Sequence, residues 1–157
     1  MRFLIPFLSA ILISLPAFAG DDLIARDGWS VVQTSKTFSA LVKDTRTAVK
    51  ANGMIVVTQA GPTAAAKKRG ITIPGNRIIG VFNNDYAVKT LVTSTAAMIE
   101  APIRLYVTEN EDGTAALSYK TPTTVFAPYA DEGGAALAAI AAELDQLFAK
   151  IAADAST

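Results

Sequence analysis

Four consecutive residues, Asn83, Asn84, Asp85 and Tyr86, offer the amide, carboxylate and phenol groups best suited to chemistry in this sequence. They follow an apolar run at 77–82, which predicts a buried strand, and they open a helical pattern. The end of such a strand often borders a crevice, and the first turn of the following helix has free backbone N–H groups. We therefore take this strand end as the first candidate for a ligand site.

Three further polar side chains, Arg104, Tyr106 and Tyr119, belong to a predicted hairpin that could reach the same strand end. In an enzyme, Asp85 would be the acid or base and Arg104 would hold an anion. The alternative is that residues 83–85 only cap a helix and that the tyrosines fill the sheet surface. These three residues and those at 83–85 are candidate ligand contacts, and we assign no catalytic residue.

Ser118 and Lys120 share a face at strand spacing, as a Ser–Lys nucleophile pair would. The S-x-x-K helical context of known serine acylases is absent around them. We therefore interpret both as hairpin residues that face solvent.

The chain contains no histidine and no cysteine. These absences exclude a Ser-His-Asp triad, a Cys-His pair, and the usual zinc, copper and haem ligands. The acidic segment at 109–113 lacks the twelve-residue spacing of a calcium loop, so we interpret it as a charged hairpin tip. We expect no metal and no cofactor.

The first nineteen residues have the pattern of a secretory signal peptide. Arg2 gives a positive start, residues 3–15 are an apolar run, and Ala17 and Ala19 place small residues before Gly20. The run is shorter than the roughly 20 residues that a spanning helix needs. The sequence therefore predicts cleavage between Ala19 and Gly20, a periplasmic or secreted protein, and no stable membrane insertion after cleavage.

The processed chain, residues 20–157, has the length of one domain. Export permits disulfides, but a chain without cysteine must rely on packing instead. The 14 basic and 14 acidic residues of the full sequence become 13 and 14 once Arg2 is removed, a net charge of −1. This balance gives no electrostatic basis for binding nucleic acid.

Hydrophobic periodicity predicts a small α+β domain with about five strands in a mixed sheet. Strands are expected at 29–34, 54–58, 77–82, 103–108 and 115–120, the last two as a hairpin. The run at 54–58 is continuously apolar, as in a strand covered on both faces. Helices are expected from 38 to the Asn52-Gly53 stop, at 63–69, and at 86–100, where Thr93-Ser94-Thr95 can split the helix. Residues 121–130 are expected to be a connector.

An apolar stripe at helical spacing predicts a last helix at about 132–153. Such a stripe usually docks on its own domain, and the alternatives are a dimer contact or a membrane-surface helix. The polar side of the helix carries Glu143, Asp145, Gln146 and Lys150 and no basic run, which argues against membrane binding.

The stretch from about 29 to 128 resembles a family known only as domain of unknown function 302. The segments that carry the resemblance are Asn52–Val57, Ala64–Gly70, Arg77–Asn84, Ala101–Val107 and Asp112–Tyr119. The resemblance implies a compact α+β domain, often a homodimer, and it implies no activity.

The sequence departs from this family's pattern at two places. Where the family has an Asp-His pair after the second strand, this chain has Gly61-Pro62. The family's Gly-Asn-Pro loop after the third strand appears as Phe82–Asn84, with only the first Asn kept. If the Asp-His pair carries out chemistry in relatives, this protein lacks the residues for that chemistry.

These observations favour an exported, non-enzymatic module that binds a small molecule or a partner protein, as a homodimer. One alternative is an enzyme built on the strand end at 83–86, which requires Asp85, Arg104 and Tyr119 to converge on one concave surface. Another is a structural subunit of an envelope complex, which a large exposed apolar patch would support.

Overall fold

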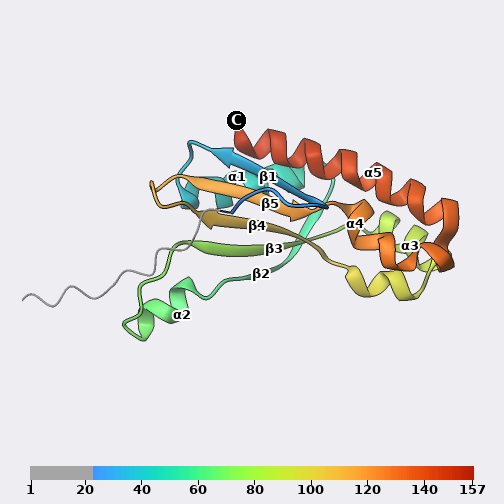
Figure 1. Cartoon of the computed structure of the whole chain (residues 1–157), viewed down its shortest axis with the longest axis horizontal. Coiled ribbons are helices and arrows are strands. Elements are labelled where there is room, and N and C mark those ends of the chain that lie inside the picture. Colours follow the sequence, from blue (N-terminus) through green and yellow to red (C-terminus); the bar gives the residue numbers. More distant parts are fainter. Residues whose placement is uncertain (1–22) are drawn as a thin grey trace, which may run out of the picture.

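Five strands form one sheet in the computed structural model, which describes residues 23–157 (Figure 1). The strands are β1 (Trp29–Thr34), β2 (Ile55–Ala60), β3 (Asn76–Phe82), β4 (Ile103–Glu109) and β5 (Ala115–Lys120). The α+β class and the five strands predicted from the sequence are confirmed. The predicted signal peptide at 1–19 and its cleavage site lie outside the described residues.

Every neighbouring pair of strands is antiparallel, and the strand order is β1-β5-β4-β3-β2. The expectation of a mixed sheet is therefore wrong. The helical crossover from β1 to β2 does give two parallel strands, as such crossovers do. However, β5, β4 and β3 lie between them, so the two parallel strands never pair.

β2 is an edge strand, which corrects the prediction that residues 54–58 are covered on both faces. Five of its six residues are exposed. Its pairing with β3 shifts register between Val56 and Thr58, and such an irregularity makes an edge less able to pair with another chain. A short apolar run fits a buried or an edge strand, and only the strand order decides between them.

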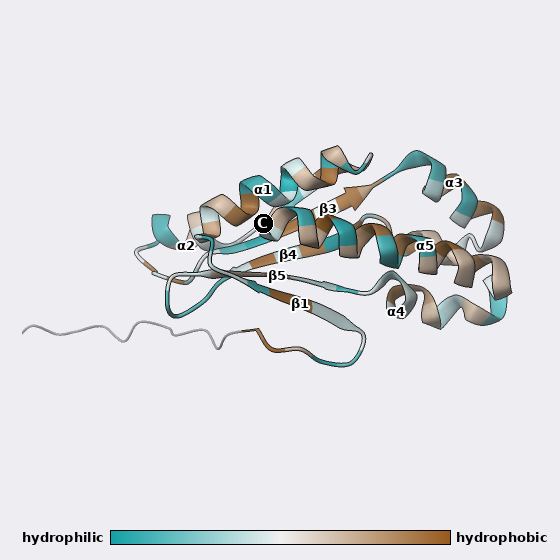
Figure 2. Cartoon of the chain, turned by 90° about the horizontal axis from the view of Figure 1, so that it is seen from above, coloured by the Kyte–Doolittle hydropathy of each residue, from teal (hydrophilic) through white to brown (hydrophobic). Residues whose placement is uncertain are grey.

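Two long helices, α1 (Phe38–Ala51) and α5 (Ala130–Ser156), pack against each other on the same side of the sheet (Figures 1 and 2). The hydroxyl of Thr37 caps α1 by accepting a hydrogen bond from the Ala40 N–H. Gly53, with a φ of 73°, follows the end of α1 in the conformation that glycine allows most readily. The predicted limits of this helix are confirmed.

The apolar stripe of α5 docks on its own domain, as the sequence predicts. Leu137, Ile140, Leu144, Phe148 and Ile151 are all buried. They pack with the side chains that β4 and β5 direct to the same face, including Leu105, Val107 and Leu117. The core therefore lies between the sheet and the pair α1 and α5.

Shorter helices gather at one end of the sheet (Figure 1). They are α3 (Asn84–Thr93), the 3₁₀ helix η1 (Ala96–Glu100), α4 (Pro122–Phe126) and the 3₁₀ helix η2 (Ala127–Tyr129). The helix expected at 86–100 is split at Ser94, whose buried hydroxyl accepts from the Ala97 N–H and donates to Glu132. The short helix α2 (Thr63–Lys68) leads from β2 toward β3, near the opposite end of the sheet.

Residues 121–130 form helices rather than the expected connector. The hydroxyl of Thr121 accepts from the Thr124 N–H and caps α4. Pro122 stands in the first turn, where its missing N–H costs no hydrogen bond. The two prolines of this segment therefore start short helices instead of preventing them.

The face of the sheet opposite α1 and α5 is open. Along β4, Leu105 and Val107 are buried toward the helices, while Arg104 is exposed and Tyr106 is half-buried on the other face. This alternation follows from the two-residue period of a strand. No helix in the described part of the chain is both long and apolar enough to cross a membrane.

Candidate functional site

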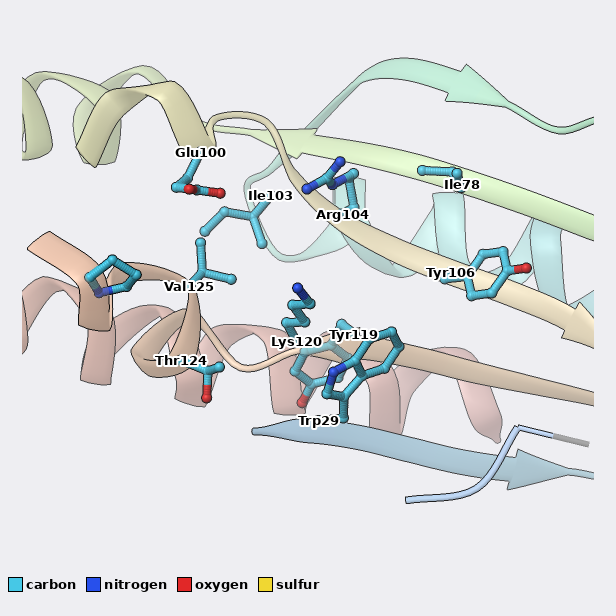
Figure 3. A pocket seen from close by; sticks show the side chains of 11 residues that line it. Trp29, Ile78, Glu100, Ile103, Arg104, Tyr106, Tyr119, Lys120, Thr124 and Val125 are labelled. Atoms are coloured by element: carbon cyan, nitrogen blue, oxygen red, sulfur yellow. The ribbon is translucent and has the colours of Figure 1, made fainter. Parts of the chain in front are cut away.

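A pocket of about 370 Å³ opens at the end of the open sheet face, next to the short helices (Figure 3). Its apolar lining consists of Ile78, Ile103, Val125 and Pro128. Its charged lining consists of Glu100, Arg104 and Lys120. The volume lies within the roughly 300–1,000 Å³ typical of small-molecule sites, so the pocket is large enough to hold a ligand.

Arg104 and Lys120 lie next to each other because of the register of the β4–β5 hairpin. Leu105 pairs with Tyr119, so the next position outward puts Arg104 opposite Lys120. Both side chains extend into the same space (Figure 3). Neither forms an ion pair with any residue of 23–157. Like charges that face each other across strands repel, and an anion between them would relieve that repulsion.

Trp29 forms the wall of the pocket on the β1 side. It pairs directly with Lys120 across the sheet, and the Lys120 Nζ lies 5.9 Å from the centre of its ring. The guanidinium of Arg26 lies 5.2 Å from the same ring. These cation–π contacts hold Lys120 and one further positive group, Arg26, at this end of the face.

Glu100 is the carboxylate that lines the pocket, and Tyr129 holds it. The Tyr129 hydroxyl donates a hydrogen bond of 2.8 Å to the Glu100 Oε1. This hydrogen bond to the carboxylate raises the pKa of the Tyr129 hydroxyl above its usual value of 10.0. The contact fixes Glu100 at the border between the pocket and η2.

Tyr106 is held on the open face by Asn76, whose side-chain N–H donates to the Tyr106 hydroxyl. The hydroxyl points away from Arg104 and Lys120 (Figure 3), so Tyr106 borders the pocket with its ring. On the neighbouring strand, Gly80 pairs with Arg104. A Cβ at Gly80 would lie 2.8 Å from Pro102 Cγ, so the glycine lets Pro102 close over β3 beside the pocket.

The strand end at 83–86 lies apart from this pocket. Asn83 caps α3: its Oδ1 accepts from the N–H groups of Asp85 and Tyr86, and its Nδ2 donates to the Gly53 carbonyl. A second, smaller pocket of about 40 Å³ includes Asn83 and Tyr86. Asn84 and Asp85 are exposed and line neither pocket. The helix-capping interpretation therefore describes what Asn83 does.

Tyr119 borders the larger pocket, but its ring packs toward the helices. The ring is 4% exposed and its centre lies 5.5 Å from that of Phe148. Ser118, expected to face solvent, is instead fully buried, and its hydroxyl donates to the Tyr106 carbonyl. Of the six candidate contacts, the structure brings Arg104 and Tyr106 together and does not bring Asp85 or the Tyr119 ring to them.

Sequence reasoning missed Trp29, Glu100 and Lys120 as pocket residues. The hairpin register alone could have placed Lys120 beside Arg104, since the two strands and their turn were predicted. No sequence signal places Trp29 or Glu100 there, because they depend on the position of β1 and of η1. Among residues 23–157, no group of three or more Asp and Glu side chains is placed to hold a metal ion.

The fold and the pocket define a class: an α+β domain with a five-stranded antiparallel sheet, two helices on one face and a ligand-sized pocket on the other. The family model of a domain of unknown function, DUF302, matches residues 30–155. The chain belongs to this family, which confirms the resemblance found in the sequence.

A solved structure has the same fold. It is the crystal structure of an uncharacterized conserved DUF302 protein from Bacillus stearothermophilus, with a TM-score of 0.72 and 22% identity. The similarity covers 82% of this chain and 98% of that chain. None of the curated proteins matches the chain.

Proposed function

We propose that this chain is an exported, non-catalytic module that binds a small ligand in the pocket beside Arg104 and Lys120, and that it acts as a homodimer. One observation carries the proposal: a pocket of about 370 Å³ contains two neighbouring cations without a carboxylate partner in the described chain. Apolar walls with a few convergent polar groups are typical of small-molecule sites.

The enzyme alternative has less support. It requires Asp85, Arg104 and Tyr119 to meet on one concave surface, and Asp85 lines neither pocket. The Tyr119 ring lies on the opposite face of the sheet, against Phe148. A binding role needs none of these three to meet, so it is the function that the geometry favours.

Native mass spectrometry of the protein purified from its own source tests the binding proposal. We expect a small-molecule adduct on the wild type. Ile78 lies on the open face and lines the pocket, so Ile78→Trp should fill the pocket and remove the adduct. Val92→Trp makes a similar change on α3, where Val92 is 84% exposed, and should keep it. A wild type without an adduct, or an adduct that survives Ile78→Trp, would contradict the proposal.

One observation favours the envelope-subunit alternative. Val88, Leu91, Val92 and Ile99 expose aliphatic side chains on α3 and η1, and exposed apolar patches often mark protein contacts. A photo-crosslinker at Val92 in intact cells should then capture a partner, whereas one at Lys43 on the outer side of α1 should not. Equal labelling from both positions would remove the support for this alternative.

A further inference from the structure

We infer that the pocket binds small organic monocarboxylates, with the carboxylate between Arg104 and Lys120 and an apolar body toward Ile103 and Val125. This inference rests on the proposed binding function and adds the chemical class of the ligand. It depends on three features of the pocket: a pair of cations, an apolar end, and one carboxylate that is already present there.

The pair of cations selects for an anion. Arg104 and Lys120 face each other on adjacent strands and both point into the pocket (Figure 3). The guanidinium offers a planar fork of N–H donors and the ammonium offers a point charge, and hydrogen bonds from charged donors to carboxylates are stronger than neutral ones. Trp29 limits where Lys120 can turn, because its ring lies opposite on β1 with the Nζ at 5.9 Å.

The apolar end of the pocket favours an organic anion over an inorganic one. Ile103, Val125 and Pro128 line the side of the pocket next to η1 and α4. A phosphate or sulfate ion between the cations would leave these walls in contact with water. A carboxylate with an aliphatic or aromatic body would cover them, and each buried methylene adds favourable transfer free energy.

Glu100 limits the charge of the ligand. It lines the same end as Ile103 and Val125 (Figure 3), and the Tyr129 hydroxyl holds it there. A second carboxylate at that end of a ligand would meet Glu100 and be repelled. The pocket therefore fits a single negative charge at the cation pair and a neutral body beyond it.

Binding of five probes to the purified protein, followed by amide chemical shifts, tests the inference. Hexanoate, 1-hexanol and hexylamine share the same body and differ in the head group, and adipate adds a second carboxylate. Inorganic phosphate is tested as well, as an anion without a body. We expect hexanoate to shift the amides around Arg104, Tyr106 and Lys120 at the lowest concentration, and adipate, hexylamine and phosphate to bind more weakly.

Charge-removing variants test the two cations. Arg104→Gln and Lys120→Gln should each weaken hexanoate binding by about tenfold, as expected when a hydrogen bond to a charged group is lost. The same variants should leave 1-hexanol binding unchanged. Arg46→Gln and Lys43→Gln make the same changes on the exposed side of α1 and should leave hexanoate binding unchanged.

The outcomes separate the inference from the function on which it rests. If 1-hexanol or hexylamine binds in the pocket as tightly as hexanoate, the pocket is a binding site and the carboxylate inference is wrong. The inference also fails if phosphate binds as tightly as hexanoate, or if Arg104→Gln and Lys120→Gln leave hexanoate binding unchanged. If no probe shifts any pocket amide, both the inference and the binding proposal are contradicted.

Discussion

The hydroxyl of Tyr129 donates a hydrogen bond to Oε1 of Glu100, with 2.8 Å between the two oxygens. The contact joins η2 to η1, two short helices that are separate in the sequence and border the same pocket. It fixes the pocket carboxylate, and it requires the proton of the Tyr129 hydroxyl.

Tyr129→Phe should destabilise the protein at neutral pH and much less at alkaline pH. The pKa of the Tyr129 hydroxyl is raised in the folded protein because it donates to Glu100. A raised pKa means that the stabilisation is present below the ordinary tyrosine value of 10.0 and is lost as the pH rises through the folded value. Urea unfolding at a series of pH values from neutral to alkaline measures the difference.

Tyr86→Phe is the matched control, because the Tyr86 hydroxyl has no hydrogen bond with any described residue. It removes a phenol hydroxyl without removing a hydrogen bond, so it should lower stability at neutral pH less than Tyr129→Phe does. A Tyr129→Phe variant whose destabilisation is the same at neutral and alkaline pH would show that the hydrogen bond does not act in solution.

Asp154→Asn should lower stability at neutral pH but not in acid. The pKa of Asp154 is lowered, first by the hydrogen bond from the Asn52 amide and then by Lys150. A lowered pKa gives a stabilisation that is present above the ordinary value of 3.8 and is lost as the pH falls through the folded value. Asp27→Asn, which removes no ion pair of the described chain, is the control. The measurement is the free energy of unfolding at pH values above and below the protonation of Asp154. If Asp154→Asn lowered the stability equally at every pH, the proposed dependence of stability on the charge of Asp154 would be contradicted.

Phe148→Ala should cost about 3–5 kcal/mol of stability, as is usual for a buried aromatic residue. Phe148 lies on α5 and is 0% exposed. Its ring contacts the ring of Tyr119 on β5. Val92→Ala on the exposed surface should change stability by no more than about 0.5 kcal/mol. Equilibrium unfolding measures both, and a loss below about 1 kcal/mol for Phe148→Ala would show that α5 does not close the core as described.

Exported protein should begin at or near Gly20. The basis is the sequence pattern of residues 1–19, with a positive start, an apolar run and small residues before the cut. Intact-mass measurement of the protein from the envelope or medium gives the terminus directly. A mature fraction that retains Met1 would overturn the export proposal.

The protein should be a dimer in solution. This prediction comes from the family resemblance, and the open sheet face offers one surface where a second copy could pack. Size-exclusion chromatography with light scattering should give twice the mass of the processed chain at micromolar concentration. A mass equal to one chain throughout the concentration range would be incompatible with the homodimer.

Much of the fold was predictable because its signals are local. The hairpin of β4 and β5 is marked by alternating residues on both sides of a Gly-containing turn. Thr37 and Asn52-Gly53 mark the limits of α1. The apolar stripe marks the presence of α5 and its buried side. The helices at 122–129 were missed because Pro122 and Pro128 indicate a break and a helix start equally well.

The candidate site was predicted only in part. Arg104 and Tyr106 are two residues apart on one strand, so their shared face follows from the period of a strand. The strand end at 83–86 and this face belong to elements that are distant along the chain, so no local pattern connects them, and the structure does not bring them together. Asn83 serves the helix that follows it, which is a local role that the sequence also allowed.

By itself, the sequence determined the export pattern, the absence of histidine and cysteine chemistry, and the positions of most strands and helices, because each depends on composition or on neighbours along the chain. Only the tertiary structure decided that every strand pair is antiparallel, that β2 lies at an edge and that β1 brings Trp29 opposite Lys120. The pocket is also decided only by the tertiary structure. Its walls come from β1, η1 and α4, whose relative positions are set by long-range packing and cannot be predicted from a local sequence pattern.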